Sequence, residues 1–230
     1  MVWAKETAFE ALTRSYGSDK MHRAHKYSDV YAALFDDKRY LFRNITEAGV
    51  KYGASLHVWL DYFPDAHVWG LDVLDEYDAK RFKLMATNRL HRLSCCESVD
   101  AISKTGLAKG SMDLVIEDAG DHSLALQSML FPQLWPLVKP GGWYVIEDVD
   151  TQRDGLNYTQ NHNSLASPLR EILEQHHAFM VDATPGITPE RWRRWQHAMR
   201  WPNPVDGKPW VASRALHNSH LLIIRRRHMT

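Results

Sequence analysis

Short apolar runs alternate with longer amphipathic stretches along this chain, and this alternation limits the possible folds more than any other feature. The strand-like runs are 45–50, 67–73, 92–96, 112–116, 143–146, 178–181 and 219–224, and the helix-like stretches are 54–62, 76–89, 99–107 and 123–137. Ser123 is predicted to cap the last helix, and Pro140-Gly141-Gly142 to stop it and turn the chain. The pattern predicts a doubly wound α/β fold, in which a mostly parallel seven-stranded sheet carries helices on both faces.

Two segments stand outside this alternation. Residues 1–43 precede the first strand-like run, and residues 183–218 separate the last two. Ligands of an open α/β sheet bind outside the carboxyl ends of its strands, and extra segments commonly cover that edge. We therefore expect one domain over residues 1–230, which consists of an N-terminal cap at 1–43, a cofactor-binding core at 44–182, a substrate-side insertion at 183–218, and a last strand and tail at 219–230.

The charge balance and the cysteines restrict the partners and the compartment. The 230 residues include 28 Lys and Arg against 28 Asp and Glu, whereas a protein that binds duplex nucleic acid usually has a basic excess. No apolar run reaches the roughly 18 residues of a membrane span, and the N-terminus lacks the pattern of a signal peptide. Cys95 and Cys96 are neighbours and make no disulfide framework. We expect a cytoplasmic protein that binds neither nucleic acid nor membrane.

A glycine loop follows the first predicted strand, and an acid ends the second. Gly49 and Gly53 let the backbone approach a ligand, and the helix that follows offers free N–H donors. Asp72 lies 19 positions beyond Gly53, where a carboxylate can accept hydrogen bonds from ribose hydroxyls. An ordinary βα turn and a solvated aspartate are the alternatives. The glycine loop and the acid together indicate an adenosine-containing cofactor, and the lack of a second phosphate-binding glycine favours S-adenosylmethionine over NAD.

Acidic side chains follow two further strands. Glu117, Asp118, Asp121 and His122 come after the fourth strand, and Glu147, Asp148 and Asp150 come after the fifth. Neighbouring parallel strands lie roughly 4.8 Å apart, so these carboxylates would repel one another unless a divalent cation held them. His122 beside them suits a general base. The alternative is a set of solvated charges, with His122 as a helix N-terminal residue.

These motifs belong to a longer set. The set comprises Tyr16-Gly17-Ser18-Asp19-Lys20, His25-Lys26-Tyr27, the glycine loop with Ser55, Gly70-Leu71-Asp72, the acidic run that ends at His122, and Pro140-Gly141-Gly142 with the strand up to Asp148. Together they span roughly residues 16–151 and resemble one branch of the class I S-adenosylmethionine-dependent methyltransferases. The branch is the macrocin and mycinamicin type of metal-dependent sugar O-methyltransferase, with its rhamnosyl O-methyltransferase and cephalosporin hydroxylase relatives.

The resemblance implies a Rossmann-like sheet with an antiparallel last strand and an N-terminal helical lid. It implies S-adenosylmethionine in the crevice and Mg²⁺, or another divalent cation, near the acceptor hydroxyl. The metal ligands would be Asp118, Glu147 and Asp148, with His122 as the catalytic base. Asp118 and His122 are four positions apart, one more than is usual in the family, so that Asp121 competes with His122 for the role of base.

The resemblance also assigns the cofactor and acceptor contacts. Glu47 would face the methionine part of the cofactor, Asp72 the ribose, and Glu97-Ser98 the adenine, with Gly49, Gly53, Ser55 and Asp118 around them. Lys20, His25 and Tyr27 would lie near the acceptor, unless they belong to a surface helix. Trp192 is a further candidate for acceptor binding, and a solvated amphipathic helix explains it equally well.

The predicted function is S-adenosylmethionine- and Mg²⁺-dependent methylation of a hydroxyl on a small molecule, a sugar or a glycosylated natural product. One alternative is a catechol- or phenol-type O-methyltransferase. Another is a non-catalytic S-adenosylmethionine-binding protein. The sequence leaves the oligomeric state open, with a homo-oligomer among the options.

Overall fold

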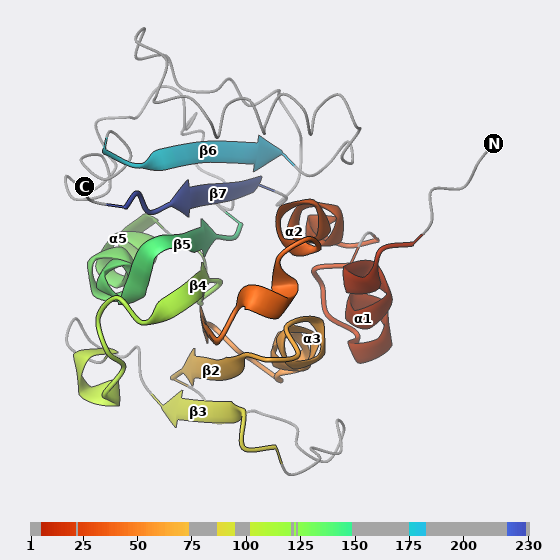
Figure 1. Ribbon diagram of the computed structural model, residues 1–230, viewed down its shortest axis with the longest axis horizontal. Coiled ribbons are helices and arrows are strands. Elements are labelled where there is room, and N and C mark those ends of the chain that lie inside the picture. The colour runs from red at the N-terminus through yellow and green to blue at the C-terminus, as the bar shows by residue number, and fades with distance from the viewer. Residues whose placement is uncertain are drawn as a thin grey trace, which may run out of the picture.

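A computed structural model gives the structure of the chain. It describes residues 6–21, 23–73, 87–94, 102–120, 122, 124–148, 175–182 and 220–228. These residues form a seven-stranded sheet in the order β3-β2-β1-β4-β5-β7-β6 (Figure 1). The strands are β1 (Asn44–Ala48), β2 (His67–Asp72), β3 (Leu90–Ser94), β4 (Met112–Glu117), β5 (Val138–Ile146), β6 (His177–Asp182) and β7 (His220–Arg225).

The first five strands are parallel to one another, and β7 is antiparallel to both β5 and β6. The α/β class that the sequence predicts is confirmed. The order reverses between β1 and β4, because the chain first builds the sheet outward to β3 and then returns to the other side of β1. A ligand of a doubly wound sheet binds at the carboxyl ends of the strands beside such a reversal.

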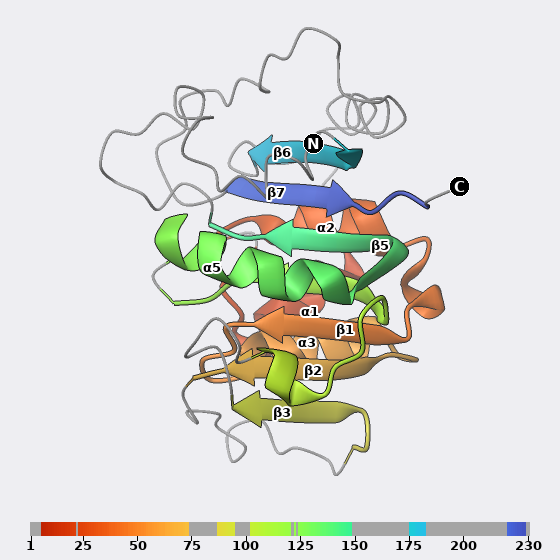
Figure 2. The ribbon, with the colours of Figure 1, turned by 90° about the vertical axis from the view of Figure 1, so that its left-hand side faces the viewer.

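Helices cover both faces of the sheet (Figure 2). On one face, α1 (Ala8–Tyr16), α2 (Tyr27–Phe35) and α3 (Ala54–Tyr62) share a buried apolar cluster with β1 and β4, and on the other face α5 (Leu124–Leu134) shares a second cluster. Short 3₁₀ turns lie at Arg39–Leu41, Ile102–Thr105 and Trp135–Leu137. The helix predicted at 54–62 is confirmed, whereas Ser123 and most of the helix predicted at 76–89 lie outside the described residues.

The N-terminal segment is part of the core. Phe9 of α1 packs its ring against Tyr31 of α2 and against Trp59 and Tyr62 of α3, with ring centroids 5.1, 5.2 and 4.8 Å away. All four side chains are fully buried. Because aromatic burial of this size contributes strongly to stability, α1 and α2 are held firmly against the sheet. The predicted insertion at 183–218 lies outside the described residues.

The end of α5 differs from the sequence expectation. The helix ends at Leu134, and Pro140-Gly141-Gly142 lie inside β5 rather than in a turn before it. The pairing of β4 with β5 shifts here, because Met112 pairs with Val138 whereas Leu114 pairs with Trp143. A Cβ on Gly142 would lie 2.9 Å from the Met112 carbonyl oxygen, so glycine permits this bulge. The predicted turn was therefore wrong.

Gly49 brings the ends of β1 and β4 into contact. The Asp118 N–H donates to the Ala48 carbonyl at 2.8 Å, and the Gly49 N–H donates to the Leu71 carbonyl at 2.8 Å. Gly49 has φ +91°, and a Cβ on it would lie 1.9 Å from the Asp118 carbonyl oxygen. Only glycine allows this approach, which places Asp118 directly beside the loop that follows β1.

We expect Gly49→Ala to lower the free energy of unfolding by about 3–5 kcal/mol, because the new methyl group meets backbone that cannot move away. Gly110→Ala is the matched control: Gly110 has φ +67°, but a Cβ on it would meet nothing within 4 Å. Gly110→Ala should lower the free energy of unfolding by about 1–2 kcal/mol, because only the left-handed backbone opposes the new side chain. Urea denaturation measures both values, and equal losses would refute the contact argument.

Candidate functional site

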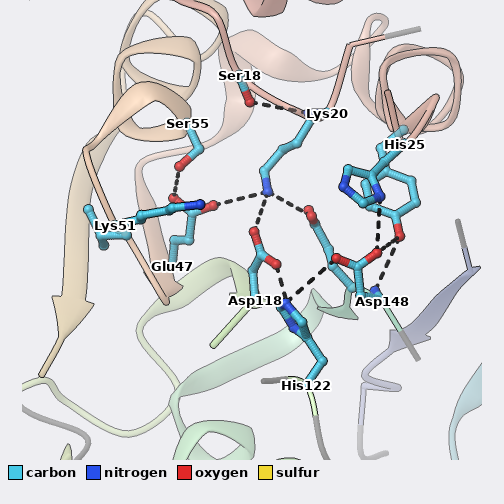
Figure 3. Close-up of polar contacts among 12 residues, drawn as sticks. Ser18, Lys20, His25, Glu47, Lys51, Ser55, Asp118, His122 and Asp148 are labelled. Carbon is cyan, nitrogen blue, oxygen red and sulfur yellow. Dashed lines mark hydrogen bonds and ion pairs between the residues drawn. The ribbon is translucent and has the colours of Figure 1, made fainter. Parts of the chain in front are cut away.

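Acidic side chains from three strands meet at the carboxyl edge of the sheet, together with side chains from the segment between α1 and α2 (Figure 3). Glu47 belongs to β1, Asp118 follows β4, and Glu147 and Asp148 follow β5. Lys20 enters this group from the N-terminal segment. The edge is the one at which the fold predicts ligand binding.

Lys20 lies at the centre of the acidic group. Its side chain is fully buried, and its Nζ lies 2.6 Å from Glu147 Oε2, 2.7 Å from Asp118 Oδ2 and 3.4 Å from Glu47 Oε1. Burial acts to lower the Lys20 pKa, but the carboxylates, Asp118 foremost, outweigh burial and hold the pKa well above its usual range. Lys20 is therefore a permanent cation that partly neutralises three carboxyl groups. The sequence assigned it to the acceptor, whereas the structure places it beneath the site.

Glu47 is held from its other side by the helix that follows. Ser55, in the first turn of α3, donates its hydroxyl to Glu47 Oε2 at 2.6 Å. Burial raises the pKa of Glu47 to about 7, although Lys20 opposes this rise. Glu47 Oε1 is buried and faces the Lys20 ammonium group at 3.4 Å. Glu47 and Ser55, which the sequence predicted at the cofactor, thus lie together.

Glu147 points into the N-terminal segment. Lys20 contacts one carboxylate oxygen, and the Tyr31 hydroxyl of α2 donates a short hydrogen bond to the other. Burial is the main cause that raises the pKa of Glu147 well above its usual range. Glu147 was predicted as a metal ligand, but both of its oxygens bind residues of the cap. Sequence reasoning missed Tyr31, although it lies four residues after Tyr27 and so on the same face of α2.

Asp118, His122 and Asp148 converge. His122 Nδ1 lies 3.8 Å from Asp118 Oδ1, and His122 Nε2 lies 3.7 Å from Asp148 Oδ2. Each residue offers one potential ligand atom, and these atoms lie within 4.8 Å of one another. His122 and Asp148 both have positive φ values, 55° and 53°. Strained backbone of this kind collects at functional sites, and here it aims both side chains at one point.

Asp148 is also bound to the N-terminal segment. Tyr27 donates its hydroxyl to Asp148 Oδ1 at 2.6 Å, and His25 Nδ1 lies 3.3 Å from the same oxygen. Burial acts to raise the pKa of Asp148, but the hydrogen bonds from His25 and Tyr27 outweigh burial and lower the pKa. Asp148 is therefore ionised. The structure thus brings His25 and Tyr27 to the site, as the sequence expected of cap residues.

Asp72 fixes the glycine loop. Its Oδ2 accepts hydrogen bonds from the backbone N–H groups of Val50 and Lys51, at 2.6 and 2.8 Å. Gly53, with φ 86°, is the N-cap of α3. The loop that the sequence predicted is therefore held in place from the end of β2. The remaining predicted contacts, Glu97, Ser98 and Trp192, and the competing base Asp121, lie outside the described residues.

Glu117 lies on the opposite face of the sheet from the site. Successive residues of a strand alternate between faces, and the Tyr144 hydroxyl of β5 donates a short hydrogen bond to Glu117 within the cluster beneath α5. Burial raises the pKa of Glu117 to about 8, although the bond from Tyr144 opposes the rise. Glu117 is therefore mostly protonated in the folded chain at neutral pH, and it takes no part in the acidic group.

Lys20→Met should lower the free energy of unfolding by about 3–5 kcal/mol, because it leaves buried carboxylates without their cation. Lys109→Met provides the control, since Lys109 is exposed, and its change should stay within about 0.5 kcal/mol. Urea denaturation at neutral pH gives both values. A change in Lys20→Met no larger than in the control would contradict the central role of this ammonium group.

A second prediction concerns pH. Glu117 holds its proton in the folded chain up to about pH 8, whereas in the unfolded chain it ionises near the ordinary value of 4.5. The folded state therefore binds more protons between these values, and stability falls as pH rises through this window. Glu117→Gln removes this fall, so its stability relative to the parent should increase by about 3–4 kcal/mol from pH 5 to pH 8, because each pH unit inside the window contributes at most about 1.4 kcal/mol. Urea denaturation at several pH values tests this, and a constant difference would refute it.

The sequence of this chain is similar to those of known O-methyltransferases. No protein-family model matches the chain. It is 30% identical over 149 residues to an 8-demethyl-8-(2-methoxy-alpha-L-rhamnosyl)-tetracenomycin-C 3'-O-methyltransferase of Streptomyces olivaceus, and the match covers 61% of this chain and 36% of that protein. It is 32% identical to the mycinamicin VI 2''-O-methyltransferase of Micromonospora griseorubida over 61% of this chain and 35% of that protein. The chain spans about a third of the length of these curated relatives.

Solved structures of methyltransferases have a similar fold. The MycE methyltransferase in complex with Mg and SAH matches with a TM-score of 0.54 at 20% identity, over 97% of this chain and 49% of that chain. The plantazolicin methyltransferase BpumL in complex with SAH matches with a TM-score of 0.54 at 14% identity, over 95% of both chains. The chain shares the fold of these methyltransferases. Its sequence similarity to sugar O-methyltransferases, over 61% of the chain, agrees with the resemblance that the motifs indicate.

Proposed function

We propose that this chain transfers the methyl group of S-adenosylmethionine to a hydroxyl of a small molecule, with the help of a divalent cation. The observation that carries the proposal is the convergence of Asp118, His122 and Asp148 at the carboxyl edge of a class I methyltransferase fold, next to the glycine loop. The curated relatives are named as O-methyltransferases of glycosylated natural products, which favours a sugar hydroxyl as the acceptor.

The residues around the glycine loop suit the cofactor. Glu47, near the end of β1, is proposed to face the methionine part of the cofactor. Gly49 and Gly53 keep the loop close to the sheet, and Asp72 at its edge is proposed to bind the ribose. Bound there, S-adenosylmethionine supplies an electrophilic methyl group. Ser55 orients Glu47, and Glu97 and Ser98 are proposed for the adenine.

Asp118 and Asp148 suit a divalent cation such as Mg²⁺, because both offer a carboxylate oxygen within 4.8 Å of the other and of His122. When bound, the cation supplies Lewis acidity that lowers the pKa of the acceptor hydroxyl. Lys20 holds the second oxygen of Asp118, and Tyr27 holds that of Asp148, so both carboxylates are oriented before any ligand arrives. The sequence proposes His122 as the base that takes the proton.

The other candidates make different use of the same site. A catechol- or phenol-type enzyme would need the same cofactor and cation but an aromatic acceptor. A non-catalytic binding protein has no need for two oriented carboxylates beside a histidine. We further propose that the chain is one cytoplasmic methyltransferase domain that acts on small molecules and not on nucleic acid or membrane. Within the described residues, no helix has the length and apolarity for a membrane crossing.

The test is methyl transfer from S-adenosylmethionine to a panel of rhamnosylated macrolides, free sugars and catechols, with product detection by mass spectrometry. We expect methylation of a sugar hydroxyl that EDTA abolishes and a divalent cation restores. Asp148→Asn, which keeps the side-chain shape and tolerates the left-handed backbone, should lower turnover by at least about tenfold. Asp65→Asn is the control, since Asp65 is a surface aspartate with half its side chain exposed.

Three results would contradict the proposal. Transfer to catechols alone would favour the phenol-type enzyme. Methyl transfer that EDTA does not affect would show that the reaction needs no divalent cation. Cofactor binding without transfer to any acceptor would favour the non-catalytic binding protein. Loss of turnover in a His122 variant does not separate a base from a metal ligand, because both roles are needed for the reaction. A titration of the same variant with the divalent cation separates the two roles, because only loss of a metal ligand weakens cation binding.

A further inference from the structure

We propose that His67 and His91 form a second metal site, which binds a transition metal ion of the kind that imidazole favours, such as Cu²⁺, Ni²⁺ or Zn²⁺. This site is separate from the cation site of the proposed function. It follows from the spacing of two ring nitrogens, from the contacts that hold both rings, and from their access to solvent.

The two rings meet through one nitrogen each. His67 is the first residue of β2, and His91 is the second residue of β3, the strand at the edge of the sheet (Figure 1). A hydrogen bond joins His67 Nδ1 and His91 Nε2 at 3.0 Å, and the two ring planes differ by 16°. Nitrogen ligands at about 2.1 Å from one metal ion are separated by about 3.0–3.4 Å. The two nitrogens therefore already have the spacing of neighbouring ligands.

Metal binding needs both of the facing lone pairs. In the hydrogen bond one of the facing nitrogens carries a proton, and on metal binding this proton moves through water to the other nitrogen of the same ring. His67 then carries its proton on Nε2 and His91 on Nδ1, both rings stay neutral, and small ring rotations turn the lone pairs toward the ion. Burial lowers the pKa of His91, and His67 lowers it further, so that the His91 ring is neutral at neutral pH.

Neighbouring residues hold the pair in place. Trp69 lies directly opposite His91 in the pairing of β2 with β3, and its ring stacks on the His91 ring with centroids 4.8 Å apart. The Arg89 guanidinium donates to the carbonyls of Leu60 and Ala66, at 3.2 and 2.9 Å, which ties the chain just before β3 to the segment before β2. Ligands that are positioned beforehand lose little entropy on binding, so these contacts favour metal binding.

The pair lies away from the acidic group. Asp72 is at the other end of β2, five residues and about 17 Å along the strand from His67. Both imidazoles are half-buried, so that water and ions reach them from outside. Among the described residues, no carboxylate or further histidine joins the pair as a third ligand, so water completes the coordination sphere.

Two imidazole ligands also decide which metals bind. Imidazole suits zinc, nickel and copper, and affinity for such sites is highest for Cu²⁺, whereas Mg²⁺ prefers oxygen ligands. We therefore expect Cu²⁺ to bind the pair most tightly, followed by Ni²⁺ and Zn²⁺, and we expect no binding of Mg²⁺ there. Mg²⁺ thus distinguishes the histidine pair from the acidic group.

The experiment is isothermal titration of the chain, prepared without a polyhistidine tag, with Cu²⁺, Ni²⁺, Zn²⁺ and Mg²⁺. His67→Gln and His91→Gln each replace one imidazole by an amide, which still forms hydrogen bonds but binds these metals weakly. His228→Gln is the matched control, because His228 is an exposed histidine outside the pair. Asp148→Asn identifies any binding at the acidic group. We expect each variant of the pair to weaken Ni²⁺ binding at least about tenfold, and the other two to stay within about twofold of the parent.

Two further measurements report on the same site. Pulsed electron paramagnetic resonance of bound Cu²⁺ should detect two coordinated imidazoles in the parent and fewer in either variant of the pair. Ni²⁺ should also raise the melting temperature of the parent but not that of His91→Gln, because an ion that binds only the folded chain stabilises it.

Several results would overturn the inference. Parent-like Ni²⁺ affinity in both variants of the pair, fewer than two coordinated imidazoles in the parent, or an equal loss in His228→Gln would each do so. A loss in Asp148→Asn alone would mean that the metal binds only the acidic group. Thermal melting without metal identifies a variant that fails to fold, and the imidazole count of the parent then decides. None of these results bears on the proposed function, which Mg²⁺ binding and methyl transfer at the acidic group test.

Discussion

The ammonium group of Lys20 is the interaction on which the site depends. Three strands bring Glu47, Asp118 and Glu147 to one edge of the sheet, and carboxylates this close would repel one another in a buried setting. Lys20 lies within 3.4 Å of all three. Because Lys20 comes from the segment before β1, the N-terminal segment is part of the candidate site and of the core at the same time.

The two acids after β5 have separate tasks because neighbouring residues of an extended chain point to different sides. Glu147 continues the inward alternation of the strand and anchors the N-terminal segment through Lys20 and Tyr31. Asp148 leaves the strand with a left-handed backbone and turns toward Asp118 and His122. One Glu-Asp pair thus supplies a structural carboxylate and a carboxylate suited to binding metal.

The acids after β4 show the same division across the sheet. Glu117 is buried beside Tyr144 on the face that α5 covers, and burial keeps it protonated near neutral pH. Asp118, one residue later, lies at the edge of the sheet with the Lys20 ammonium group beside it. The glycine at position 49 makes this placement possible, because any side chain there would collide with the Asp118 carbonyl. The loop and the acid are therefore coupled through backbone contact.

The sequence by itself determined the α/β class, the strand positions to within a few residues, and the edge at which the acidic side chains gather, because these follow from local apolar patterning and from where strands end. It did not determine which acids would be structural and which would face a ligand. Those roles depend on Lys20, 98 residues from Asp118 and 127 from Glu147, and on close packing of backbones, as at Gly49 and in the bulge at 140–142. Contacts between segments so far apart in the chain are decided only when the tertiary structure brings them together.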